Sequence, residues 1–90
     1  MGKASRKTAG GQTIHVEALA ENGKVVHVKI TGVSLREHIL QDIERELKGA
    51  ELEAKELEGR VKLALIKAEA ELYGADALDI AELVLEAVLQ

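Results

Sequence analysis

The chain has 90 residues and a formal net charge of −4. Its charge is unevenly placed: residues 1–33 hold five basic and two acidic side chains, whereas residues 34–90 hold seven basic and fourteen acidic side chains. It has no cysteine, which excludes disulfides, thiolate metal ligands and thiol catalysis, and its single tyrosine is its only aromatic residue. No apolar run approaches the roughly 20 residues of a membrane helix, and the basic N-terminus lacks the stacking aromatics of a nucleic-acid binder. We therefore expect the chain to bind neither membrane nor nucleic acid. We expect it to be cytoplasmic and to form a single domain over residues 1–90.

The first nine residues allow two interpretations. Residues 1–9 form either a flexible basic N-terminus or an edge strand, which would run from Ala4 to Ala9. The glycine pair at Gly10 and Gly11 then predicts a tight turn. No helix and no Gly-Lys-Ser/Thr sequence follows the pair, so it does not have the pattern of a phosphate-binding loop.

Residues 12–31 alternate between apolar and polar side chains, which predicts two antiparallel strands. A three-residue loop, Glu21 to Gly23, would place the apolar residues of the two strands opposite one another. The predicted pairs are then Ile14 with Ile30, Val16 with Val28, and Ala18 with Val26. A two-residue turn is the alternative, and it would set apolar residues against polar ones.

In this predicted register the polar side of the hairpin carries a mixed group of residues. Glu17 pairs with His27, His15 pairs with Lys29, and Leu19 pairs with Val25 as an outward apolar spot. His15, Glu17 and His27 resemble a metal ligand set, but the lysine opposite His15 disfavours a cation, so we predict no metal. The apolar pair is either an isolated surface feature or a docking patch.

Three helices are predicted after the hairpin. Ser34 and Glu37 have the spacing of a capping box for the first helix, which Gly49 would end. The second helix is predicted from about Ala54 to Tyr73, and Asp76 can cap the third. Gly59 lies inside the second helix and marks a start, a bend or a close helix crossing. The predicted fold class is α+β, an antiparallel hairpin or three-stranded sheet followed by three helices packed on one face.

Two stretches carry a resemblance to a known family. Residues 10–16 (GGQTIHV) and 43–49 (IERELKG), in the order glycine pair, strand, hairpin, strand and helices, resemble the accessory domain of lipoate–protein ligases. This domain is the C-terminal part of bacterial ligases and a separate small chain in some archaea. The resemblance also implies a fold similar to the NifU and SufE iron–sulfur assembly proteins, whose cysteines are absent here.

The resemblance implies a non-catalytic role. The chain would be the accessory subunit of a two-component lipoate–protein ligase, required for ATP-dependent lipoate activation to lipoyl-adenylate. The catalytic subunit, its heterodimer partner, would bind lipoate, ATP and Mg²⁺ and transfer the lipoyl group to acceptor domains, which this chain would meet only indirectly. No catalytic, cofactor-binding or metal-binding residue is therefore assigned to this chain.

The expected contact with the partner is the outer side of the hairpin together with the basic N-terminus. Its predicted residues are His15, Glu17, Leu19, Val25, His27 and Lys7. The alternative function is a protein-interaction or dimerisation module unrelated to lipoate. Asparagine occurs once, and glutamate and lysine are abundant, a composition reported for hyperthermophiles and consistent with an archaeal two-chain ligase.

Overall fold

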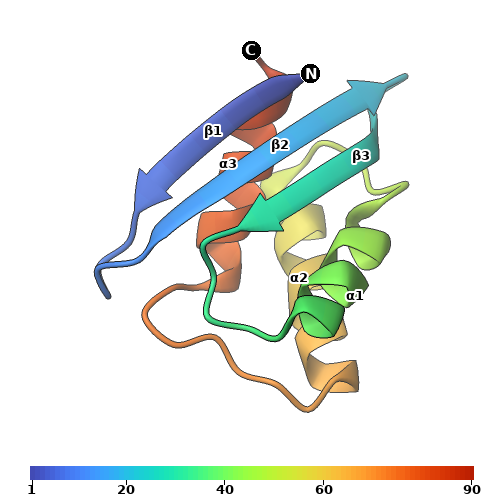
Figure 1. Cartoon of the computed structure of the whole chain (residues 1–90). Coiled ribbons are helices and arrows are strands. Elements are labelled where there is room, and N and C mark those ends of the chain that lie inside the picture. Colours follow the sequence, from blue (N-terminus) through green and yellow to red (C-terminus); the bar gives the residue numbers. More distant parts are fainter.

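The computed structural model describes residues 1–90 and shows a sheet with helices on one side (Figure 1). The elements follow one another in the order β1 (Gly2–Lys7), β2 (Thr13–Glu21), β3 (Lys24–Thr31), α1 (Glu37–Leu47), α2 (Ala54–Lys67) and α3 (Ala77–Val88). The three strands are antiparallel in the order β1-β2-β3. The predicted α+β class, a three-stranded sheet followed by three helices, is confirmed.

The helices cover a single face of the sheet. α3 packs across β1 and β2, α1 packs against β3, and α2 lies against both of these helices. The inward residues of the strands, among them Ile14, Val16 and Ile30, are almost fully buried in one cluster of 21 core residues. The apolar side of the ribbon from Ile14 to Ile30 is therefore covered by the chain's own helices, as predicted, and its polar side is left open.

The N-terminal residues form the strand β1 at one edge of the sheet. It begins at Gly2, earlier than the predicted Ala4, and ends at Lys7. Ala4 pairs with Val16 and Arg6 with Ile14 on the neighbouring strand. The amide of Gly11 donates to the carbonyl of Thr8 at 3.0 Å, which closes the turn into β2.

The predicted register between β2 and β3 is wrong. Val16 pairs with Ile30 and Ala18 with Val28, while Ala20 pairs with Val25. The hairpin turns through the two residues Asn22 and Gly23, both with positive φ, as a type I′ turn requires. The shift between the two halves of the ladder leaves Val26 as an extra residue, a β-bulge.

The bulge is fixed by the loop between α1 and α2. The amide of Val25 donates to the carbonyl of Ala50 at 2.9 Å, and the amide of Gly49 donates to the carbonyl of Val25 at 2.8 Å. Val25 is thus held between β2 and this loop, and its side chain is 1% exposed. Val25 and Val28 both point inward although they are three residues apart, which strict alternation forbids and a bulge permits.

The first two helices differ from prediction at one end each. α1 begins at Glu37 after Arg36, without a side-chain cap; Ser34 instead accepts a hydrogen bond from Gln12 Nε2 at 3.2 Å. α2 ends at Lys67, before the predicted Tyr73. The third helix begins as predicted, because the amide of Asp76 donates to the Asp79 carboxylate at 2.9 Å in a capping box.

The turn that follows α2 contains a residue with left-handed backbone conformation that is not glycine. Glu69 has φ of 52°. Its amide donates to Ile66 O at 3.1 Å and the Ala70 amide to Leu65 O at 2.9 Å, the bonds of a Schellman motif. The motif satisfies carbonyls that would otherwise lack partners and stops the helix, although the glutamate side chain strains the backbone.

One arginine ties the first strand to the last helix. Arg6 donates to Glu82 at 2.8 Å, to Glu86 at 2.7 Å and to Asp79 at 3.3 Å. The hydrogen bond to Glu82, with further contributions from Asp79 and Glu86, raises the pKa of the Arg6 guanidinium above its ordinary value. The guanidinium therefore stays charged at any pH at which a protein is studied, and the cluster joins residues more than 70 positions apart.

We expect Arg6→Gln to lower the free energy of unfolding by about 1 kcal/mol, because three carboxylates of α3 would lose their shared cation and repel one another. The loss should shrink at high salt, where screening shortens the range of the repulsion. Urea denaturation at low and high salt measures both effects. Lys3→Gln is the control, because Lys3 forms a single exposed pair with Glu17; an equal loss in both variants would contradict the role given to the cluster.

We expect Glu69→Gly to stabilise the chain by about 1 kcal/mol, because glycine adopts the left-handed conformation without strain. Glu69→Ala is the matched control: it removes the same charge and leaves the strain in place. Thermal unfolding followed by circular dichroism distinguishes the two. A similar unfolding midpoint for the glycine and alanine variants would show that backbone strain at this position does not affect stability.

Candidate functional site

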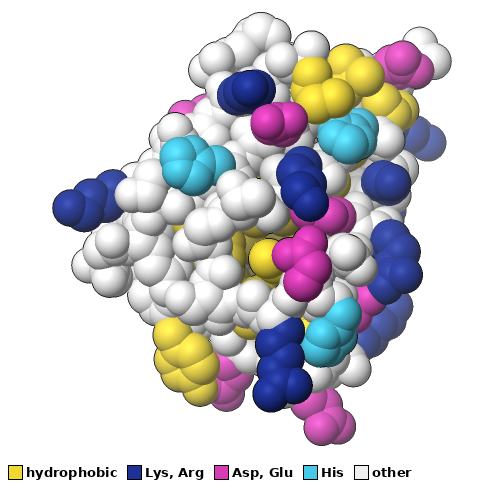
Figure 2. All heavy atoms as spheres, in the orientation of Figure 1, with side chains coloured by type: hydrophobic (Ala, Val, Ile, Leu, Met, Phe, Trp, Pro, Cys, Tyr) yellow, Lys and Arg dark blue, Asp and Glu magenta, His cyan; other side chains and the backbone are white.

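The side of the sheet that faces away from the helices is not covered by any other part of the chain. We call it the outer sheet face. Its side chains come from all three strands: Lys3, Ser5, Lys7, Thr13, His15, Glu17, Leu19, Val26, His27, Lys29 and Thr31. Figure 2 looks onto this face and shows basic, acidic and histidine side chains mixed along it, with hydrophobic side chains gathered at one end.

Most of the predicted contact residues lie on this face, but in a different arrangement. His15 pairs with Thr31 rather than Lys29, and His27 pairs with Leu19 rather than Glu17. The predicted His-Glu-His group is therefore not brought together. Lys7 lies at the end of β1, one strand away from His15. The chain holds no group of three or more histidine or carboxylate side chains arranged for a metal ion.

Val25 was predicted on the outer face and is in the core. The bulge turns its side chain inward and brings Val26 outward, where it is 40% exposed. The apolar spot of the outer sheet face is therefore Leu19 and Val26, at the end of β2 and the start of β3 (Figure 2). Sequence reasoning missed Val26 because two adjacent valines satisfy the apolar pattern equally well in either register.

Charges of both signs surround the apolar spot. Glu17 lies opposite Lys29 in the ladder and 3.6 Å from Lys3 on the other neighbouring strand. Lys29 lies 3.8 Å from Glu37 at the start of α1. All of these side chains are exposed or half-buried, so they contribute little to stability. They are free to rearrange, and they offer a partner protein both hydrogen-bond donors and acceptors around an apolar centre.

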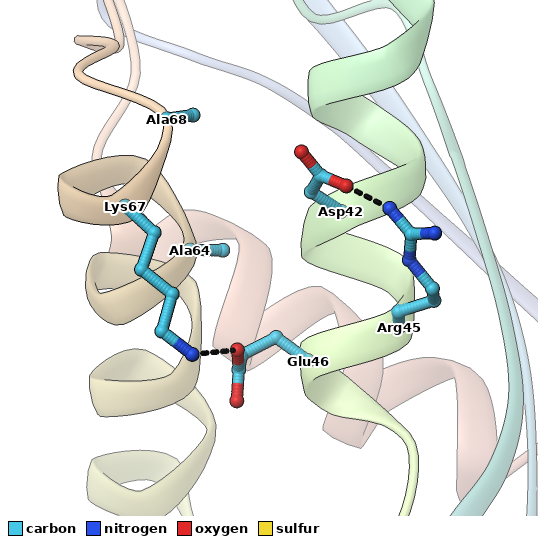
Figure 3. A pocket seen from close by; sticks show the side chains of 6 residues that line it. All are labelled: Asp42, Arg45, Glu46, Ala64, Lys67 and Ala68. Carbon is cyan, nitrogen blue, oxygen red and sulfur yellow. Dashed lines mark hydrogen bonds and ion pairs between the residues drawn. The ribbon is translucent and has the colours of Figure 1, made fainter.

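A groove of about 330 Å³ lies between α1 and α2 (Figure 3). Glu46 and Lys67 meet across it at 3.2 Å, and Arg45 pairs with Asp42 along α1. Each charge in the groove therefore has an opposite partner from the chain itself. The rest of the lining is Ala64 and Ala68, which bring no reactive group. The Glu46–Lys67 pair joins the two helices, and we assign the groove a structural role.

Comparison with known families gives one result. Residues 3–84 match the family described as the bacterial lipoate protein ligase C-terminus. The match includes β1 from its second residue, all of β2, β3, α1 and α2, and α3 as far as Val84, so it covers the outer sheet face and most of the helices behind it. No curated protein gives a significant match. With at most 14 residues, none of the three helices could cross a bilayer.

We expect Val25→Ala to lower the free energy of unfolding by about 2–3 kcal/mol, since it removes buried methyl groups and leaves a cavity. Val26→Ala, the same change at the adjacent exposed position, should stay within about 0.5 kcal/mol of wild type. Urea denaturation of the two variants is the measurement. Equal losses, or the reverse order, would contradict the bulge.

Proposed function

The chain belongs to the family of bacterial lipoate–protein ligase C-terminal domains, and on that premise we propose that it is the non-catalytic accessory subunit of a two-component lipoate–protein ligase. The observation that carries the proposal is the family match over residues 3–84. In the proposed reaction the catalytic subunit binds lipoate and ATP with Mg²⁺. The lipoate carboxylate attacks the α-phosphate, lipoyl-adenylate forms and pyrophosphate leaves. A lysine amine of an acceptor domain then takes the lipoyl group and releases AMP.

The accessory subunit would act on the first of these two steps. Lipoyl-adenylate is a mixed anhydride, which water hydrolyses, so its formation benefits from a closed site that excludes water. Closed sites are commonly completed by mobile loops, whose position a second subunit can hold. We propose that this chain holds such loops of the catalytic subunit in the closed arrangement.

The proposed contact surface is the outer sheet face. Its apolar spot, Leu19 and Val26, is partly exposed at 38% and 40%, and buried apolar anchors supply much of the affinity of protein interfaces. The surrounding charges, Glu17 and Lys29 among them, would fix the orientation of the partner by electrostatic complementarity. His15 and His27 add hydrogen-bonding groups in the outward pairs on either side of Glu17 and Lys29. Lys7 extends the surface along β1.

We expect the chain to stimulate lipoate-dependent ATP–pyrophosphate exchange by its catalytic subunit. Leu19→Asp should weaken this stimulation about tenfold or more, since it places an uncompensated charge in the apolar centre of the interface. Leu78→Asp is the matched control. Leu78 is exposed to a similar degree, 40%, but lies in the first turn of α3, where aspartate is compatible with the helix dipole.

Two results would contradict parts of the proposal. Exchange unaffected by the added chain would reject the accessory role and favour the alternative, an interaction or dimerisation module unrelated to lipoate. Stimulation that Leu19→Asp and Leu78→Asp leave equally intact would keep the accessory role but move the contact away from the outer sheet face.

A further inference from the structure

A second surface on the helical side of the molecule has the features of a docking site. We call it the α2 stripe. Its members are Lys55, Gly59, Lys62, Leu63 and Ile66, all exposed. The helix repeat of 3.6 residues places them on one side of α2, opposite the buried residues Leu57, Val61, Ala64 and Leu65. The α2 stripe therefore faces away from the core and from the sheet.

Gly59 is the first observation. It is the only glycine inside any of the three helices, and glycine destabilises a helix interior relative to alanine. A Cβ atom added at this position would meet no other atom within 4 Å. Nothing within the chain therefore requires glycine here. A glycine on an exposed helix surface does allow the backbone of another helix to approach closely.

The neighbours of Gly59 are the second observation. Leu63 is 41% exposed and Ile66 is 72% exposed. The positions 59, 63 and 66 are separated by four and three residues, which is the spacing of a seam between two packed helices. Single exposed apolar residues are common on protein surfaces. Leu63 and Ile66 instead lie in line with Gly59, so the three positions together form a strip along which another helix can pack.

The charge of the stripe indicates what would cover it. Lys55 and Lys62 are its only charged members, in a chain whose residues 34–90 hold twice as many acidic as basic side chains. A two-fold dimer of this chain would bring the stripe against itself and place like charges together. Lys62 lies 3.6 Å from Glu58, in a pair whose side chains are 60% and 28% exposed and that can rearrange at little cost. The complementary surface is a helix with an apolar seam and acidic flanks.

We propose that the α2 stripe binds an acidic amphipathic helix of the catalytic subunit, an inference that rests on the proposed function. The helix crosses α2 at Gly59, its apolar seam covers Leu63 and Ile66, and its carboxylates lie near Lys55 and Lys62. The outer sheet face and the α2 stripe lie on opposite sides of the molecule, since α2 is on the helical side of the sheet (Figure 1). The catalytic subunit would then contact this chain on both sides.

The test is the affinity of the full chain for the catalytic subunit, measured by isothermal titration calorimetry. Gly59→Ala should raise the melting temperature of the isolated chain by about 4–8 °C, because alanine is the better helix former, and should nevertheless weaken binding. Gly59→Leu should weaken binding by about tenfold or more, because a large side chain blocks the helix crossing. A variant that is more stable and binds less tightly cannot owe its lost affinity to misfolding.

Charge variants test the identity of the occupant. Lys62→Glu should weaken binding about tenfold and Lys62→Arg should preserve it, whereas Gln41→Ala, an exposed change on α1, is a neutral control. Wild-type affinity in both Gly59→Leu and Lys62→Glu overturns the α2 site and leaves the accessory role intact. If Gly59→Leu binds more weakly while Lys62→Glu keeps the wild-type affinity, the acidic character of the partner helix is overturned. A catalytic subunit that does not bind the wild-type chain at all overturns this inference and the proposed function together.

Discussion

A sheet of three strands has one apolar side, and in water that side has to be covered before the strands can persist. Here the cover is α3, which crosses β1 and β2 and meets the core with Ile80, Leu83 and Val84, all fully buried. α1 covers the remaining strand, and α2 closes the gap between the two helices. This contact uses the inward residues of the strands, so the opposite side, which is polar apart from Leu19 and Val26, is exposed and available for a partner. The candidate site is thus a consequence of how the core is closed.

The sequence predicted those parts of the fold that depend on neighbouring residues. Alternation identified β2 and β3, and the capping pair of Asp76 and Asp79 identified the start of α3, because both signals arise within a few positions. The β-bulge depended on distant contacts and was not predicted. The bulge at Val26 is set by hydrogen bonds between Val25 and the loop at Gly49 and Ala50, which lies about 25 residues further along the chain.

The ends of the first two helices illustrate the same limit. Ser34 has the right spacing for a cap, yet its hydroxyl accepts a hydrogen bond from Gln12 instead, so a tertiary contact displaced a local one. Glu69 adopts a left-handed backbone that sequence statistics reserve mainly for glycine. The candidate site follows the same division. Its polar residues were predicted from alternation, whereas the exchange of Val25 for Val26 required the bulge to be known. The likeness to NifU and SufE proteins stays a prediction.

The Arg6 cluster has a consequence for how the protein is made. It joins the first strand to the last helix, and Gly2 lies so close to the carbonyl of Ala87 that no side chain would fit between them. A nascent chain leaving the ribosome can form the β2–β3 hairpin early, but β1 has no helix to pack against until α3 has emerged. We therefore expect the domain to fold only after α3 has left the ribosome. Until then the apolar side of the ribbon is exposed to chaperones.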